Sequence, residues 1–299
     1  MRTKSANSSL KMPSHNPRTI AEAIDACRQR LRGISGSPWL DARLLAQHVT
    51  GLDASAVIAY GDAAIDARRR SRLFDLTERR AAGEPVAYLI GHKSFCGLEI
   101  AVDRRALVPR PESEELVVLC VDDWNGKAPA IAELGTGSGA IACALAHLLP
   151  NASVTAGDSN IDALELAAHN VTALGFGEQV TLVHSDLFAE FPPGTYDAII
   201  ANLPYVATQD LDNLERQVQE HEPHEALFAG VDGLALYRRL LEEAQGRLSL
   251  GGALYFECGP YNALTLADLV RKGFPGSQVS VHRDTAGLER IVRCSTGPL

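Results

Sequence analysis

Apolar residues in the first part of the chain recur at the spacing of an α-helix. From Ile20 to Leu31 they follow one another at intervals of three and four residues, which places them on one helical face. Thr19 and Glu22 form the pattern of a capping box, so the helix is expected to begin there. Gly33 is the expected end.

Three more helices are predicted before residue 90. Ser37 and Pro38 open the second and Gly51 ends it, Asp53 caps a short third, and a fourth runs from about Asp66 to Ala82. Short helices joined by short loops are typical of a small bundle. We therefore expect residues 19–89 to form an N-terminal helical bundle that recognises a partner.

The pattern then changes to one of strands. Between Ser94 and Val102, apolar residues alternate around Cys96-Gly97, which predicts a β-hairpin within a linking segment of residues 90–107. Five strand-like runs follow: Ala130–Leu134, Ser153–Gly157, Val180–His184, Tyr196–Ala201 and Ala253–Glu257. Most are separated by helical stretches, such as Ile161–Leu174 and Leu234–Leu248.

Strands that alternate with helices predict a parallel sheet with right-handed crossovers. Two last runs, Gln278–Arg283 and Leu288–Cys294, are joined by a short turn and are expected to pair antiparallel at one edge of the sheet. The predicted fold class is therefore α/β, a Rossmann-like domain over residues 108–299 preceded by the helical bundle.

Composition narrows the possible functions. The chain has 299 residues and a net charge of −9, which disfavours a nucleic-acid substrate because phosphate contacts call for basic surfaces. No apolar run is long enough to span a membrane. Residues 1–18 are polar and are interpreted as a disordered leader rather than a secretory signal, with a weak organelle-targeting role left open.

Cysteines and histidines suggest no metal. The six cysteines lie far apart with no CxxC pair, as expected of reduced, buried thiols in a cytoplasmic protein. His221-Glu222-Pro223-His224 has no evident third ligand, and its proline interrupts helical geometry.

A glycine-rich loop follows the first strand of the α/β domain. Residues 133–139 read Glu-Leu-Gly-Thr-Gly-Ser-Gly, and glycines there allow a tight turn that brings a ligand to a helix N-terminus. A structural glycine turn is the alternative. Asp158 ends the next strand and could accept hydrogen bonds from both ribose hydroxyls, or cap a helix. Leu187 follows the third strand, where an adenine needs an apolar wall.

The fourth strand runs into Asn202-Leu203-Pro204-Tyr205. An amide nitrogen is a poor nucleophile because its lone pair is delocalised, and two acceptors on its N–H groups would localise that pair. The Asn202 side-chain oxygen and the Leu203 carbonyl are two such acceptors. Pro204 restrains Leu203, and Tyr205 offers a flat apolar face. A strand-ending turn is the alternative.

The chain resembles the protein-(glutamine-N5) methyltransferases that modify bacterial and organellar peptide-chain release factors. Three segments carry the resemblance: residues 87–114, which include Pro-Arg-Pro-Glu at 109–112; the loop 133–139 with Asp158; and residues 202–230, which include Glu222-Pro223. The resemblance spans residues 19 to the C-terminus. It implies an S-adenosyl-L-methionine-dependent methyltransferase of translation termination, acting on the glutamine of a release factor's Gly-Gly-Gln motif.

The resemblance also implies roles for individual residues. The cofactor would be bound by Gly135, Thr136, Gly137, Ser138, Gly139, Asp158, Leu187 and Asn202. The glutamine amide would be held by Asn202, Leu203, Pro204 and Tyr205. Glu112 would lie near the cofactor, unless it forms a salt bridge or a helix cap.

Two positions depart from the family pattern. Leu203 stands where the family usually has the first proline of N-P-P-Y, which keeps the carbonyl, loses the fixed φ and restores an N–H. Glu133 stands where the family commonly has Asp, and could still reach the methionine amino group. We expect in-line methyl transfer with no metal, no covalent enzyme intermediate and no dedicated general base.

Other interpretations remain open from the sequence. They are methylation of a ribosomal-protein glutamine, methylation of an adenine in DNA or RNA, and a non-catalytic S-adenosylmethionine-binding adaptor. The arginine-rich helix (Arg68, Arg69, Arg70, Arg72, Arg79 and Arg80) is either a solvated face or a docking surface for an acidic or RNA-associated partner. We expect a monomer.

Overall fold

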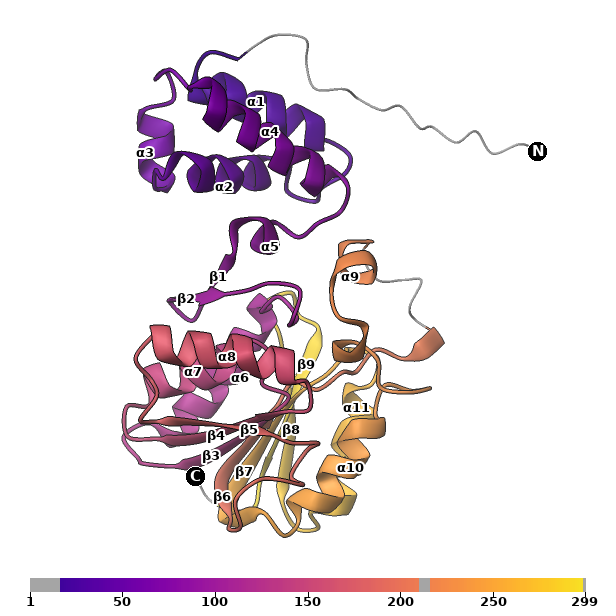
Figure 1. Ribbon diagram of the computed structural model, residues 1–299. Coiled ribbons are helices and arrows are strands. Elements are labelled where there is room, and N and C mark those ends of the chain that lie inside the picture. Colours follow the sequence, from indigo (N-terminus) through magenta and orange to yellow (C-terminus); the bar gives the residue numbers. More distant parts are fainter. Residues whose placement is uncertain (1–16, 210–215, 298–299) are drawn as a thin grey trace, which may run out of the picture. The chain divides into compact units, whose positions relative to one another are not determined.

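The computed structural model describes residues 17–209 and 216–297 (Figure 1). The leader predicted over residues 1–18 lies almost wholly outside the described residues. The chain divides into two compact units. The first extends through Gly91 and includes the helix Arg216–His221, and the second contains the remainder from His92.

The first unit is the predicted helical bundle. Its helices are α1 (Ile20–Leu31), α2 (Pro38–Thr50), α3 (Ala54–Ala59), α4 (Ala67–Ala81), α5 (Val86–Ile90) and α9 (Arg216–His221). The capping box is formed as predicted, because the Glu22 N–H donates to Thr19 Oγ1 while the Glu22 carboxylate accepts from the Thr19 N–H. Asp53 and Asp66 cap α3 and α4.

The helix α9 is a difference from the sequence prediction, which placed all of residues 108–299 in one domain. In the structure this segment packs with the first unit. Gln217 Oε1 accepts a hydrogen bond at 3.1 Å from Arg80, whose guanidinium also pairs with Asp41. A polar six-residue helix gives no sign in the sequence of such a distant partner.

The second unit begins with the predicted hairpin, formed by β1 (His92–Phe95) and β2 (Leu98–Ala101). Both turn residues have positive φ, 47° at Cys96 and 79° at Gly97, as a two-residue hairpin turn requires. Helix α6 (Pro111–Trp124) follows. Glu114 on α6 accepts a hydrogen bond from the Cys96 N–H at 3.1 Å, so the hairpin is tied to the α/β unit.

A seven-stranded sheet forms the centre of the second unit, in the order β5-β4-β3-β6-β7-β9-β8. The strands are β3 (Ala130–Leu134), β4 (Ser153–Asp158), β5 (Val180–His184), β6 (Tyr196–Ala201), β7 (Leu248–Glu257), β8 (Gln278–Arg283) and β9 (Glu289–Ser295). The pairs among β3 to β7 are parallel. Strand β9 pairs antiparallel with β7 and β8, which confirms the predicted antiparallel hairpin at the edge.

Helices cover both faces of the sheet (Figure 1). Helices α6, α7 (Ala140–Leu148) and α8 (Ile161–Ala173) lie on one face, and α10 (Ala235–Ala244) and α11 (Ala263–Gly273) on the other. One hydrophobic cluster lies under α10 and α11, where Ile199 and Phe256 of the sheet pack with Leu240 and Leu266. Among the described residues, no helix is long and apolar enough to cross a membrane.

Strand β7 is longer than predicted, since it starts at Leu248 rather than Ala253. The sequence prediction ends a helical stretch at Leu248 and begins the strand at Ala253, with a loop between them. In the structure, Gly251 takes a φ of 81°, and the pairing with β6 shifts register between Tyr196 and Ala198 instead of ending. The segment before Ala253 therefore continues strand β7 as an irregular stretch, in which Gly251 adopts a positive φ, and does not form a loop.

Two glycines of positive φ give a test of this packing. A Cβ on Gly139 (φ 76°) would lie 3.0 Å from Ala167 Cβ, whereas a Cβ on Gly175 (φ 79°) meets nothing within 4 Å. Gly175→Ala should therefore lower the free energy of unfolding by about 1–2 kcal/mol through backbone strain alone. Gly139→Ala should lower it by a further ~1–3 kcal/mol through overpacking. Urea unfolding measures both, and equal losses would contradict the close approach of α8.

Candidate active site

A cavity of about 520 Å³ opens at the carboxyl ends of the parallel strands. This volume is ordinary for a small-molecule site. Its wall includes Leu134, Gly135, Gly137, Gly157, Asp158, Ser185, Leu187, Asn202, Leu203 and Pro204. Four different strands thus contribute residues at their ends, which is where open α/β sheets bind ligands.

The glycine loop forms one side of this cavity. The N–H groups of Gly135 and Thr136 donate to the Gly157 carbonyl at 2.8 and 3.0 Å, which holds the loop against β4. Gly135 and Gly137 line the cavity, but Thr136, Ser138 and Gly139 do not. Thr136 and Ser138 are buried. The loop therefore presents backbone, not side chains, to the cavity.

Asp158 stands at the end of β4 with both carboxylate oxygens held by main-chain donors. Oδ2 accepts from the Gly137 N–H at 2.8 Å and Oδ1 from the Asn160 N–H at 2.9 Å. Burial raises the pKa of this carboxyl. Each carboxylate oxygen keeps a further lone pair, so the side chain can still accept two hydroxyl groups of a ligand.

Leu187 lies on the cavity wall in an unusual backbone conformation. Its φ is 51°, a region that leucine rarely adopts. Ser185 stabilises the turn, because its hydroxyl donates to the Leu187 carbonyl at 2.7 Å and accepts from the Glu190 N–H at 2.9 Å. An apolar side chain is thereby held on the wall of the cavity that Asp158 also lines, as a site for a heteroaromatic ring would require.

Asn202 belongs to a chain of hydrogen bonds between distant elements. Its Nδ2 donates to Ser113 Oγ at 3.1 Å, and Ser113 Oγ donates to Glu257 Oε2 at 2.6 Å. The hydroxyl of Tyr205 donates to Glu257 Oε1 at 3.4 Å. The amide nitrogen of Asn202 is directed to Ser113, and its Oδ1 is the one atom of this side chain that can accept a hydrogen bond.

Glu257, at the centre of this chain, is almost wholly buried at the end of β7, with 1% of its surface exposed. Burial raises its pKa to about 7, against the opposing hydrogen bond from Ser113. A group in this range changes charge near neutral pH. The orientation of Asn202 therefore depends on a buried carboxyl outside the cavity.

The other residues of the tetrapeptide differ in their surroundings. Leu203 and Pro204 line the cavity, whereas Tyr205 does not. The Tyr205 carbonyl accepts hydrogen bonds from the Tyr261 hydroxyl at 3.0 Å and from Asn262 Nδ2 at 3.3 Å. The segment is therefore tied to the start of α11 as well as to the sheet.

Two acidic residues that the sequence placed near the cofactor are absent from the cavity wall. Glu133 lies beneath the loop, where its Oε2 accepts from Thr136 Oγ1 at 2.9 Å, and only 1% of its surface is exposed. Burial raises its pKa to about 8. Glu112 is in the first turn of α6 and also lies off the wall.

Within the His221–His224 segment, the Glu222 carboxylate forms two contacts with the chain around Arg110. Glu222 Oε1 pairs with Arg110 at 2.6 Å, and its Oε2 accepts from the Val108 N–H at 3.2 Å. This carboxylate thus joins the Pro-Arg-Pro-Glu segment to the chain before α10. Within residues 17–209 and 216–297, no three or more His, Cys, Asp or Glu side chains are grouped so that they could hold a metal ion.

Sequence reasoning missed three residues of the site: Ser113, Tyr237 and Glu257. Glu257 could have been predicted from the sequence, because it ends an apolar strand at the same edge of the sheet as Asp158 and Asn202. Ser113 and Tyr237 could not, since each meets the site through a contact with a residue 34 or more positions away.

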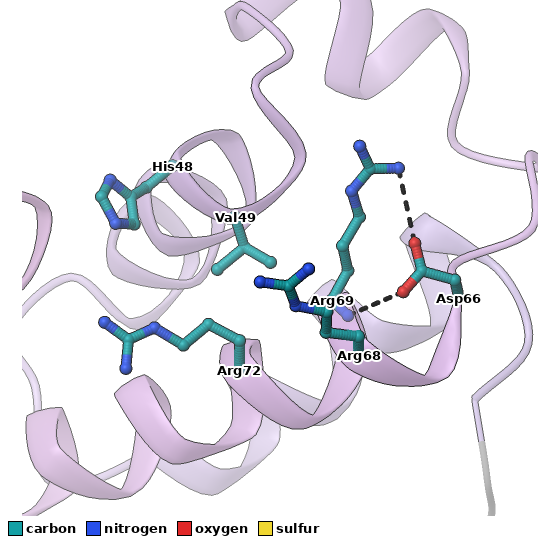
Figure 2. Close-up of a pocket in the computed structure, with 6 residues that line it drawn as sticks. All are labelled: His48, Val49, Asp66, Arg68, Arg69 and Arg72. Carbon is teal, nitrogen blue, oxygen red and sulfur yellow. Dashed lines mark hydrogen bonds and ion pairs between the residues drawn. The ribbon is translucent and has the colours of Figure 1, made fainter.

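The first unit holds a separate, basic cavity of about 440 Å³. Figure 2 shows Arg68, Arg69 and Arg72 of α4 around it, with His48 and Val49 of α2. Arg69 pairs with Asp66 at 3.5 Å. Of the other arginines, Arg70, Arg79 and Arg80 have partners within the unit, so they do more than form a solvated face.

Comparisons with known proteins agree with this geometry. Residues 22–91 match the family described as PrmC N-terminal domain, and residues 114–222 match the Methyltransferase small domain. A methyltransferase structure from Pyrococcus furiosus superposes with a TM-score of 0.50 at 22% identity, covering 67% of this chain and 90% of that one. The predicted methyltransferase fold is confirmed.

Two curated relatives are similar along most of their length, and both are named release factor glutamine methyltransferase. The protein from Rhodopirellula baltica is 38% identical over 264 residues, which cover 86% of this chain and 89% of the relative. The protein from Deinococcus radiodurans is 40% identical over 258 residues, which cover 86% and 91%.

The two buried carboxyls predict how stability depends on pH. Both pKa values are raised in the folded chain, from 4.5 to about 8 for Glu133 and to about 7 for Glu257. Folding therefore favours the protonated forms, and stability should fall as pH rises from about 4.5 through 8. Glu133→Gln, which mimics the neutral acid, should flatten this decline. Melting temperatures between pH 5 and 8 measure it, with Glu178→Gln at an exposed position as control. An unchanged slope in Glu133→Gln would refute the buried neutral acid.

Proposed function

We propose that this chain, which belongs to the release factor glutamine methyltransferase family, methylates the side-chain amide nitrogen of the glutamine in the Gly-Gly-Gln motif of a peptide-chain release factor. The chain is an S-adenosyl-L-methionine-dependent methyltransferase. The glutamine substrate and the residue roles below are our proposal.

One observation carries the proposal: the tetrapeptide acceptors and the nucleoside-type site share one cavity. Asn202 and Leu203 line it together with Gly135 and Asp158. Asn202 Oδ1 and the Leu203 carbonyl would accept the two N–H groups of a primary carboxamide. The lone pair of that nitrogen would then point toward the glycine loop, where the methyl donor would lie.

The residues present fit S-adenosylmethionine. The Asp158 carboxylate can accept the two ribose hydroxyls, Leu187 offers an apolar wall for adenine, and the backbone of Gly135 and Gly137 leaves room for the methionine part. The cofactor supplies a methyl group on a positively charged sulfur. The protein itself contributes position and orientation, which can be worth about 7–11 kcal/mol.

We propose that three residues of the glycine loop act on the cofactor indirectly. Thr136, Ser138 and Gly139 would shape the loop that holds the cofactor, because they are off the cavity wall. Tyr205 would support the substrate site through Glu257. We also infer that the enzyme acts as a monomer in the cytoplasm, where release factors function.

We further propose that the helical bundle recognises the partner. Its basic cavity is formed by Arg68, Arg69 and Arg72 with His48 and Val49. Positive charge of this kind favours a partner with an acidic surface over one with an apolar surface. Nucleic acid is not expected as the methyl acceptor, given the net charge of −9.

Removal of the Asn202 acceptor should abolish most turnover. Asn202→Ala should lower kcat on a purified release factor by about 10²–10³-fold, as loss of a preorganised polar contact to the reacting group does. The KM for S-adenosylmethionine should change little. Transfer of a labelled methyl group measures both, with Asn125→Ala at an exposed helix end as control. Normal turnover by Asn202→Ala would refute the role, and parallel assays with ribosomal protein and DNA would expose the rival substrates.

Loss of the Asp158 carboxylate should act on cofactor binding instead. Asp158→Ala should raise the Kd for S-adenosylmethionine by at least about tenfold, since two charge-assisted hydrogen bonds are lost. Titration calorimetry measures it. Asp268→Ala, which removes an exposed acid on α11, should bind as the parent does. Unchanged affinity in Asp158→Ala would place the ribose elsewhere.

A further inference from the structure

The main-chain N–H of Leu203 needs a partner inside the protein. Proline at this position, the family's usual residue, has no N–H and fixes φ. Leucine restores the donor and leaves φ free, and Leu203 is only 4% exposed. A buried N–H without an acceptor is costly and rare in native structures.

The acceptor is the hydroxyl of Tyr237 on α10, 3.2 Å from the Leu203 nitrogen. The same hydroxyl donates to the carbonyl of Glu257 and lies 3.5 Å from the carbonyl of Ala201. A tyrosine hydroxyl has one donor and spare acceptor capacity. With its proton directed to a carbonyl, it can accept from Leu203 at the same time. One oxygen atom thus joins the carboxyl ends of β6 and β7.

Packing around Tyr237 restrains the position of its hydroxyl oxygen. Tyr237 has no exposed surface, and its ring lies 5.4 Å from that of Phe256, centroid to centroid. The peptide group is planar, so holding the Leu203 N–H also holds the plane between Asn202 and Leu203. That plane lies between the Asn202 side chain and the Leu203 carbonyl, the two proposed acceptors.

Leucine also makes a contact that proline could not make in the same way. A Cβ built on Gly135 would lie 3.0 Å from Leu203 Cδ2, so the leucine side chain packs closely on the glycine loop. The substitution therefore gives the acceptor segment an apolar contact with the cofactor loop, while the backbone restraint of proline is absent.

We propose that Tyr237 is a positioning residue for methyl transfer, whose hydroxyl takes over through the Leu203 N–H the restraint that proline supplies in N-P-P-Y. The inference rests on the proposed function, in which the Leu203 carbonyl and Asn202 hold the glutamine amide. Tyr237 touches neither substrate nor cofactor, and it acts through the backbone of the acceptor segment.

A double-mutant cycle tests this coupling. Tyr237→Phe should lower kcat on a release factor about tenfold, because small misplacement of a reacting group is costly, with the KM for S-adenosylmethionine within about twofold. In the Leu203→Pro background, the same Tyr237→Phe change should lower kcat less than about twofold, since no N–H is left to hold. The quantity compared is the fold-change in kcat that Tyr237→Phe causes in the parent and in the Leu203→Pro background.

Tyr255→Phe is the matched control. It removes the hydroxyl of a fully buried tyrosine on β7, which donates to Asp123 at 2.6 Å and accepts from Trp124 Nε1 at 3.0 Å. It should lower the melting temperature as Tyr237→Phe does but leave kcat near that of the parent. A purely structural role for Tyr237 predicts equal effects on kcat from both variants.

Hydrogen–deuterium exchange gives a second readout that needs no activity. The Leu203 amide should exchange at least about tenfold faster in Tyr237→Phe than in the parent or in Tyr255→Phe. If Leu203→Pro does not fold, this comparison decides the matter. Unchanged exchange, or an equal loss of kcat in both Leu203 backgrounds, would overturn the inference. A parent enzyme that methylates no release factor would instead refute the proposed function, and the exchange result would still stand.

Discussion

Parallel pairing of β3 with both of its neighbours is the constraint on which the site depends. Leu134 of β3 is level with Gly157 of β4 and with Ala201 of β6. The next residue of each strand therefore emerges at the same edge: Gly135, Asp158 and Asn202. A shift of one residue in the pairing of β3 with β4 or with β6 would turn the side chain of Asp158 or of Asn202, respectively, to the opposite face. Strand register thus decides which residues line the cavity, and side-chain chemistry acts only on the residues placed there.

Around that edge, buried polar groups hold the acceptor segment in one orientation. Glu257 receives hydrogen bonds on its side chain from Ser113 and Tyr205, and its carbonyl accepts from Tyr237. Ser113 then binds the amide nitrogen of Asn202. Networks of this kind are favourable only when each member has its partner. The arrangement therefore uses elements from α6, β7 and α10 to orient a single asparagine.

The departure from N-P-P-Y shows how one substitution changes the source of rigidity. In the proline form, the restraint is covalent and local. Here Leu203 packs on Gly135, and its N–H is held by a residue on another helix. The site therefore depends more on the packing of α10 against the sheet, where Tyr237 is wholly buried.

Local rules were enough to place the glycine loop, Asp158 and the Asn202 segment at one edge of the sheet. Each follows a strand that is recognisable from apolar residues and turn signals, and strand ends meet at one edge in an α/β fold. The same rules predicted the capping box at Thr19 and the Cys96-Gly97 turn. They failed at β7, because the sequence does not reveal that Gly251 absorbs a register shift within a continuing strand.

The sequence by itself determined the order of helices and strands, the backbone freedom of the glycine loop and the chemical groups at the strand ends, because these depend on residues close along the chain. Only the tertiary structure decided which of those groups reach the cavity. It buried Glu133 beneath the loop, and it joined Ser113 to Glu257 across 144 positions and Tyr237 to Leu203 across 34. Such contacts arise from packing between distant elements, and no spacing in the sequence records them.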